Sequence, residues 1–220
     1  LRQHGIDQAS ISGDTRFDRV KQIAEASAPN QIVEEFKGGD FLLIAGSSWP
    51  PDEKIIKKAN ANGIKTIYAP HEVHEERIDQ LMKSLEGKAV RYSKTNLSEL
   101  RKARVLIIDS IGMLSQLYKY ADIAFIGGGF GKGIHNILEA VTFNIPVIFG
   151  PNYQKFREAR ELINEKGAFC ITNENDFRLL MGKLLSDKGY YEKSSEICKN
   201  YILRNMGATQ KIVSYLNDIL

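Results

Sequence analysis

The sequence lacks a long apolar run, is poor in cysteine and carries almost no excess charge. No apolar stretch approaches the roughly 20 residues of a membrane span, and no signal peptide is recognisable. Only Cys170 and Cys198 carry thiols, at a separation that fits neither a metal-ligand nor a redox motif. We expect two idle thiols in a reducing compartment, and no metal site. A net charge of +3, spread along the chain, argues against a nucleic-acid partner.

What the chain does contain is a repeated alternation of short apolar segments and amphipathic helical patterns. Near-continuous apolar strands between helices indicate a parallel sheet that is covered on both faces. We predict one α/β domain over residues 1–220, with a doubly wound, Rossmann-like sheet of about six strands and a helical tail from residue 175 that breaks near Lys188 and Gly207. The candidate strands cover residues 9–13, 41–46, 64–69, 89–92, 105–109, 123–126, 145–149 and 168–171, of which the first is weak and the fourth is a candidate edge strand.

The opening residues, 1–5, read like the middle of a longer sequence. We therefore expect a fragment of a larger protein.

The most distinctive segment, residues 126–140, contains five glycines in seven positions. It follows an apolar strand and leads into a helical pattern that we expect to run from about His135 to Phe143. A strand, a glycine-rich loop and a helix N-terminus together present backbone N–H groups to an anion, most often a phosphate. The segment fits the dinucleotide fingerprint poorly, and Lys132-Gly133-Ile134 departs from the P-loop's Gly-Lys-Ser/Thr.

Doubly wound sheets bind ligands beyond the carboxyl ends of their strands, near the switch in strand order. The loops that follow the candidate strands carry small or polar residues, and together they predict a cleft with several hydrogen-bonding groups. These loops are residues 13–16, 46–49, 70–72, 109–112, 127–133 and 150–153.

Taken together, the loops resemble the carboxyl-terminal, nucleotide-sugar-binding half of a GT-B glycosyltransferase. They are most similar to the Kdo (3-deoxy-D-manno-octulosonic acid) transferases of lipopolysaccharide synthesis. The most specific block is Gly-x-His-Asn-x-x-Glu at residues 133–139, followed by Phe-Gly-Pro at 149–151. The blocks that carry the likeness, in the family's order, are residues 12–18, 45–48, 69–72, 109–112 and 127–139, the last continuing into 149–151 and 156–158.

This resemblance implies an inverting transfer of Kdo from CMP-Kdo to a lipid A precursor at the cytoplasmic face of the bacterial inner membrane. It implies no cofactor and no metal to hold the donor phosphate. In the family the carboxyl-terminal half binds CMP-Kdo, whereas the amino-terminal half carries the acceptor site, the membrane-facing surface and a catalytic carboxylate. This chain would then bind the donor and hold no catalytic residue. The alternatives are a GT-B relative that uses a UDP-sugar, and a non-catalytic nucleotide-binding module.

The resemblance and the loop positions assign the donor site. Glu139 would accept both ribose hydroxyls and Asn136 would meet a phosphate or the sugar carboxylate, with His135 on the same helical face. The alternative for that face is a surface glutamate with a capping asparagine. The turn at residues 111–113 resembles the one that carries the cytosine ring. The full candidate set is Arg16, Ser47, Ser48, His71, Ile111, Gly112, Met113, Gly128, Gly129, Lys132, His135, Asn136 and Glu139.

Several of these residues also have simpler interpretations. Ser47 and Ser48 either bind the donor or cap the next helix. Arg16 and Lys132 are either counter-charges for the donor or solvated side chains. His71 stands where many family members have the arginine of Pro-Arg-His, and Met113 stands where many have the glutamate of Gly-Glu-Leu. We expect Trp49, Phe130 and Tyr153 to form walls and not a stacking platform.

Overall fold

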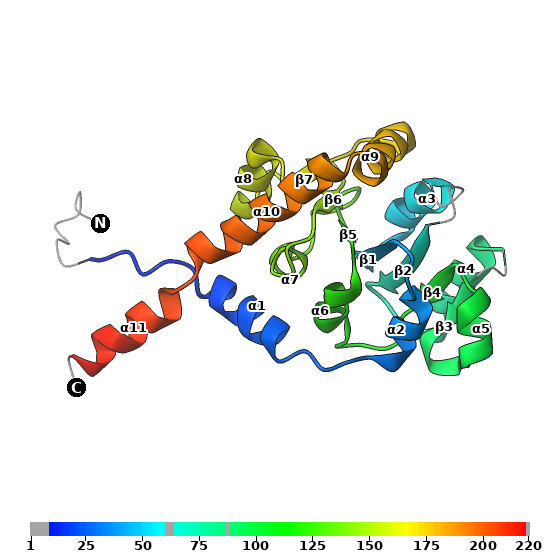
Figure 1. Cartoon of the computed structure of the whole chain (residues 1–220), viewed down its shortest axis with the longest axis horizontal. Helices are drawn as coiled ribbons and strands as arrows, with labels where there is room; N and C mark the ends of the chain where they lie inside the picture. Colours follow the sequence, from blue (N-terminus) through cyan, green and yellow to red (C-terminus); the bar gives the residue numbers. More distant parts are fainter. Residues whose placement is uncertain (1–8, 60–63, 87–88, 219–220) are drawn as a thin grey trace.

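The computed structural model describes residues 9–59, 64–86 and 89–218, which build a parallel seven-stranded sheet between two layers of helices (Figure 1). The strand order is β3-β4-β2-β1-β5-β6-β7. The strands are β1 (Leu42–Ser48), β2 (Lys65–Pro70), β3 (Ala89–Arg91), β4 (Val105–Ile107), β5 (Ile123–Ile126), β6 (Val147–Phe149) and β7 (Ala168–Cys170). The predicted doubly wound fold is confirmed, and the order reverses between the neighbouring strands β1 and β5.

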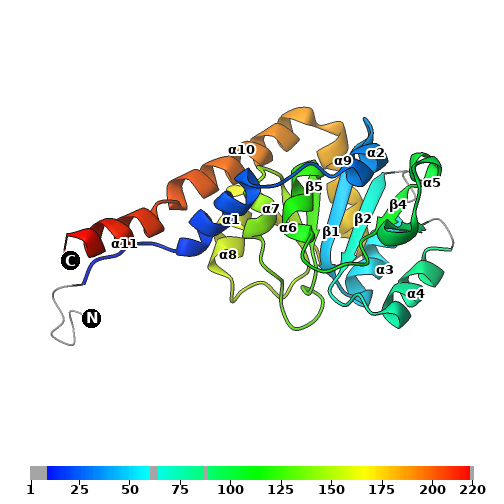
Figure 2. The same ribbon diagram turned by 90° about the horizontal axis from the view of Figure 1, so that it is seen from below.

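Helices cover both faces of this sheet, and α11 extends beyond it (Figures 1 and 2). One face packs against α3 (Pro50–Ala59), α4 (Glu75–Ser84) and α9 (Glu174–Ser186). The other packs against α1 (Thr15–Glu25), α2 (Gln31–Lys37), α5 (Leu97–Lys102), α6 (Leu114–Leu117) with the 3-10 turn η4 (Tyr118–Tyr120), α7 (Leu138–Val141), α8 (Arg157–Glu165) and α10 (Lys188–Asn205). A further 3-10 turn, η3 (Tyr92–Lys94), follows β3, and α11 spans Ala208–Asn217.

Strand side chains alternate between the two helical layers, as period-2 geometry requires. In β1, Leu42 and Ile44 join the core on the α1 side, whereas Leu43 and Ala45 join the core on the α3 side. All four are buried. Because both faces are covered, the strand reads as a continuous apolar run in the sequence.

The predicted first strand at residues 9–13 is wrong. The chain there is irregular, and Ile11 is 94% exposed, since no neighbouring strand is available to bury it. Regular structure begins at α1, where the Asp14 carboxylate accepts the Arg16 N–H as the N-terminal cap. The opening residues 1–5 lie outside the described part of the chain.

The helical tail and its two breaks are confirmed. The α10 helix begins at Lys188, and Gly207 takes a left-handed conformation (φ 98°) before α11. Asp18 of α1 accepts hydrogen bonds from the Gly207 N–H at 2.6 Å and the Thr209 N–H at 2.7 Å, so α11 is anchored to α1. Among the described helices, none combines the length and the apolar composition of a membrane span.

Replacing Asp18 tests this anchor. Asp18→Ala should cost α11 about 0.5–2 kcal/mol of local stability, the usual cost of losing a cap, and Asp18→Asn should cost less because it keeps one acceptor oxygen. Amide exchange across residues 208–217 measures the loss. The Gly207 N–H lowers the pKa of Asp18, so its contribution is present above the ordinary aspartate value of about 3.9 and is lost as pH falls through the lowered pKa. Unchanged exchange in Asp18→Ala would contradict the anchor.

Candidate functional site

Two backbone segments meet in close contact at the reversal of strand order, where ligands of such sheets bind. Gly46 of β1 pairs with Ile126 of β5, and the chains then turn away as residues 47–49 and the glycine loop, residues 127–133. A Cβ on Gly127 would lie 2.1 Å from the Ser47 carbonyl oxygen. Ser47 itself has a φ of 50°, a conformation that few L-residues adopt, so this end of β1 is strained.

The loop that follows β6 supports the glycine loop from the other side. A Cβ on Gly129 would lie 2.5 Å from the Gly150 nitrogen, and the Asn152 N–H donates to the Gly129 carbonyl at 2.9 Å. Gly128 is buried with a φ of 91°. These contacts require glycine for space at Gly129 and for conformation at Gly128.

A buried carboxylate holds the two strand ends together. Oδ2 of Asp52, in the first turn of α3, accepts the Trp49 N–H at 2.9 Å and the Gly128 N–H at 3.0 Å. Asp52 is fully buried, and its Oδ1 has no hydrogen-bond partner among the described residues. Burial raises the pKa of Asp52. Sequence reasoning missed this residue, because an aspartate in a first helical turn is ordinarily a dipole partner.

The predicted helix over residues 135–143 is wrong in its start and its length. The α7 helix is a single turn, Leu138–Val141, and residues 134–137 before it have no regular structure. The His135 N–H donates to the Gly127 carbonyl, and the Ile134 N–H donates to the Asn152 carbonyl. His135, Asn136 and Glu139 therefore do not share a helical face.

Asn136 and Glu139 nevertheless lie together. Asn136 Nδ2 donates to Glu139 Oε1 at 3.2 Å, while Asn136 Oδ1 accepts the Leu138 N–H, as the capping alternative expected. Burial raises the pKa of Glu139, and the Asn136 bond opposes that shift. Burial, and then the charge of Glu139, raise the pKa of Tyr118, whose hydroxyl lies against Gly46.

Three aromatic rings from three strand ends stack on one another. Trp49 lies on His71 with ring centroids 4.7 Å apart, and His71 lies on His135 at 4.6 Å. Trp49 Nε1 also donates to His135 Nε2 at 3.3 Å. Burial, and then the neighbouring His71, lower the pKa of His135. Trp49 is thus a stacking residue as well as a wall.

Two hollows adjoin this stack and collect many of the predicted residues. An inner hollow of about 150 Å³ brings together Ser47, His71, Ile111 and Gly112 from the ends of β1, β2 and β4. A larger hollow of about 410 Å³, here the glycine-loop cavity, is lined by Trp49, Pro51, Asp52, Gly128, Phe130, Gly131, Lys132, Gly133 and His135.

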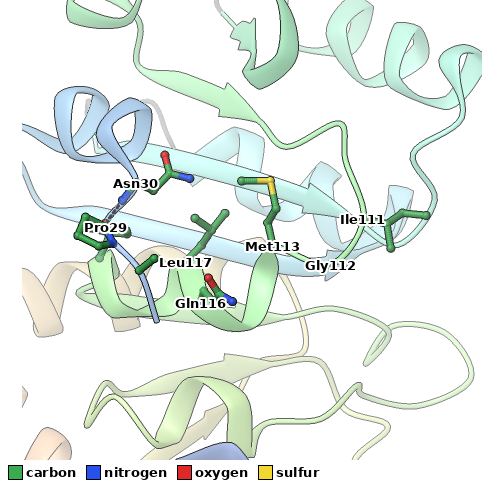
Figure 3. Close-up of a pocket in the computed structure, with 9 residues that line it drawn as sticks. Pro29, Asn30, Ile111, Gly112, Met113, Gln116 and Leu117 are labelled. Carbon is green, nitrogen blue, oxygen red and sulfur yellow. Dashed lines mark hydrogen bonds between the residues drawn. The ribbon is translucent and has the colours of Figure 1, made fainter. Parts of the chain in front are cut away.

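A third hollow, of about 260 Å³, lies behind the turn at residues 111–113 (Figure 3). Pro29 and Asn30 lie at one end of it and Ile111 at the other, with Met113 between them. Ile111 is 87% exposed, and Gly112 has a φ of 90°. Ile111 and Gly112 therefore line both the inner hollow and this third hollow, whereas Met113 lines the third.

Two predicted donor residues are engaged elsewhere. The buried Ser48 hydroxyl donates to Glu53 at 2.9 Å, and Glu53 pairs with the buried Arg77. Arg16 bridges Asp14 at 2.8 Å and the buried Glu158 at 2.9 Å. Neither side chain lines the hollows described above.

Solved structures with the same fold include glycosyltransferases and a nucleotide-sugar epimerase. The "C-terminal CMP-Kdo binding domain of WaaA" from Acinetobacter baumannii has a TM-score of 0.69 and 19% identity, covering 84% of this chain and 97% of that one. Anabaena HepE with UDP-glucose has a TM-score of 0.58 and 14% identity, covering 87% and 54%. The fold is that of the carboxyl-terminal domain of a GT-B glycosyltransferase. No protein-family model matches the chain.

Sequence similarity then narrows this class. The chain is 33% identical over 187 residues to the 3-deoxy-D-manno-octulosonic acid transferase of Aquifex aeolicus, covering 78% of this chain and 51% of the relative. It is 30% identical over 225 residues to that of Haemophilus influenzae, covering 97% and 52%. The chain belongs to the 3-deoxy-D-manno-octulosonic acid transferase family and spans about half the length of these curated relatives.

The role of Asp52 as a clamp predicts a large effect on stability for one substitution and a small effect for another. Asp52→Ala leaves two N–H groups without an acceptor and should cost about 2–4 kcal/mol of unfolding free energy. Asp52→Asn keeps an acceptor oxygen and removes the buried charge, so it should be close to wild type in stability. Urea denaturation of both variants measures these differences.

The same denaturation series should be repeated across pH. Since the pKa of Asp52 is raised, its contribution to stability is complete below the ordinary aspartate value and is lost as pH rises through the raised pKa. The stability of Asp52→Asn relative to wild type should therefore increase with pH. A difference that stays constant across pH would show that Asp52 does not titrate in this way.

Proposed function

We propose that this chain is the donor-binding half of an inverting glycosyltransferase that takes Kdo from CMP-Kdo. The observation that carries the proposal is the convergence of Ser47, His71, Ile111 and Gly112 on one hollow beyond the carboxyl ends of β1, β2 and β4. The glycine-loop cavity lies beside it, at the reversal between β1 and β5. The combined volume of the inner hollow and the glycine-loop cavity falls within the roughly 300–1,000 Å³ of ordinary ligand sites. The family relationship and the solved WaaA domain, whose name states that it binds CMP-Kdo, support the choice of donor.

The donor phosphate would lie in the glycine-loop cavity, beside Gly131 and Gly133. A Cβ at either position would meet no atom closer than 3.5 Å, so an anion can approach the backbone there, and Lys132 adds a positive charge at the rim of the cavity. The α7 helix is too short and begins too late for its dipole to carry this contact. Ser47, His71 and His135 supply further donors, and Gly128 and Gly129 shape the loop.

The nucleoside would lie between the turn at residues 111–113 and α7. Backbone groups of Ile111 and Gly112, with Met113 behind them, would read the cytosine edge. Asn136 orients the Glu139 carboxylate, which accepts the ribose hydroxyls. We propose supporting roles for Ser48 and Arg16, because Glu53 and Glu158 already occupy their polar groups.

The rest of the reaction would belong to a second domain. An amino-terminal half would bind the lipid A precursor, face the inner membrane from the cytoplasm and supply the catalytic carboxylate, since the family is larger than this chain. The donor phosphate would be held without a metal ion. The chain alone would then bind the donor but would not catalyse the transfer.

A UDP-sugar donor is the second candidate, because structures of HepE with UDP-glucose share the fold. Calorimetric titration with CMP, UDP and NAD separates the donors: binding of UDP without binding of CMP would reject the Kdo assignment. A non-catalytic module is the third candidate. Co-expression with the missing half and a transfer assay on lipid A precursor tests it, since failure of the restored protein to transfer would leave only the module.

Glu139→Ala should weaken CMP binding by about 1.5–3 kcal/mol, the loss expected for hydrogen bonds to a charged group. That corresponds to a dissociation constant roughly 10- to 150-fold higher by calorimetry. Glu76→Ala, an exposed glutamate in the first turn of α4, is the matched control and should bind CMP as wild type does. Wild-type affinity in a folded Glu139→Ala variant would remove the ribose role.

A further inference from the structure

The stack of Trp49, His71 and His135 joins the three loops that form the candidate site. Trp49 follows β1, His71 follows β2, and His135 follows the glycine loop. His71 stacks on Trp49 at 4.7 Å and on His135 at 4.6 Å, and the indole N–H closes the arrangement by donating to His135. Because three separate chain segments contribute one ring each, the stack fixes the relative position of the loops.

The Trp49 bond indicates the tautomer of His135. A ring nitrogen that accepts an N–H carries no proton, so this bond fits a neutral His135 with its proton on Nδ1. An imidazolium has two N–H donors and no acceptor, and its formation would break the bond. The lowered pKa of His135 agrees with this arrangement.

The stack stands between the two hollows. His71 lines the inner hollow, whereas Trp49 and His135 line the glycine-loop cavity. A nucleotide-sugar that spans both spaces has its phosphate between nucleoside and sugar, next to these rings. The stack is therefore at the point where an elongated anionic ligand must be positioned.

We propose that Trp49 is a positioning residue of the donor site, which holds His135 in the neutral Nδ1–H tautomer and His71 in its stacked position so that both meet the donor phosphate. This inference rests on the proposed function for its ligand, a nucleoside monophosphate ester. The tautomer itself is a property of the ligand-free protein and is tested without nucleotide.

Among the described residues, the charged groups of α3 nearest the stack are already engaged. Asp52 shares the glycine-loop cavity with Trp49 and His135 but accepts the Gly128 N–H, and the buried Glu53 pairs with Arg77. Lys132 is on the glycine loop, while Glu72 lies beside His74, at 3.7 Å, before α4. A neutral His135 leaves Lys132 as the nearby cation for the phosphate and keeps the cavity free of a second buried charge.

Histidine ¹⁵N NMR reads the tautomer directly, and the chain has only four histidines to assign. In wild type at pH 8 we expect His135 with protonated Nδ1 and unprotonated Nε2. Trp49→Phe keeps a stacking ring but removes the indole N–H, so His135 should shift toward the Nε2–H tautomer and its pKa should rise. A wild-type His135 with Nε2–H, or an unchanged tautomer and pKa in Trp49→Phe, overturns the proposal.

CMP binding by calorimetry supplies the second readout. Trp49→Phe should bind CMP about three- to tenfold more weakly, the loss of one hydrogen bond between uncharged groups, and Trp49→Leu, which also loses the stack, should bind still more weakly. His74→Asn is the matched control, because His74 caps α4 from the same loop as His71, outside the stack, and asparagine also caps helices. Unfolding in urea confirms that each variant is folded.

The outcomes separate the two proposals. If wild type binds CMP and Trp49→Phe binds it equally well, the positioning role is overturned and the proposed function stands. If wild type shows the Nδ1–H tautomer but does not bind CMP, the proposed function fails and the bond between Trp49 and His135 remains established.

Discussion

The contact between the ends of β1 and β5 is the constraint on which the rest of the site depends. The Ser47 carbonyl lies where a Cβ of Gly127 would be, so only glycine permits the two strand ends to approach this closely. Asp52 then holds the approach by accepting one N–H from each side. Two features carry a local cost in free energy. Ser47 has a positive φ, and Oδ1 of the buried Asp52 has no hydrogen-bond partner among the described residues. The packing of the surrounding sheet offsets this cost.

This contact between strand ends determines how an anion would be held. A phosphate site after a strand usually relies on the positive end of a long helix. Here α7 is a single turn, and residues 134 and 135 lie outside it, held by bonds to Asn152 and Gly127. In the proposed donor site, Lys132, His71 and His135 would take the place of the dipole. Several N–H groups of the glycine loop already donate to partners within the protein. The site is therefore built from loops that brace one another, and its geometry depends on their mutual contacts.

The two helical layers contribute differently to the site. On one side, α3 brings the Asp52 clamp and the pair of Glu53 with Arg77 beneath the strand ends. On the other, α1 binds the start of α11 through Asp18, and Arg16 binds Glu158 of α8. These long-range polar contacts join elements far apart in sequence. Residues 12–18 therefore take part in packing between distant elements, and none of them lines the three hollows described above.

The sequence by itself determined the alternation of strands and helices, the breaks at Lys188 and Gly207, the loops that carry the site and the family. Those features follow from local periodicity, turn chemistry and short motifs. Only the tertiary structure decided that residues 9–13 are not a strand, that His135 leaves the helix to stack on His71, and that Trp49 and Asp52 join the site. The physical reason is that burial, stacking and pairing between distant segments override local preference, and a pattern read along one chain does not contain those partners.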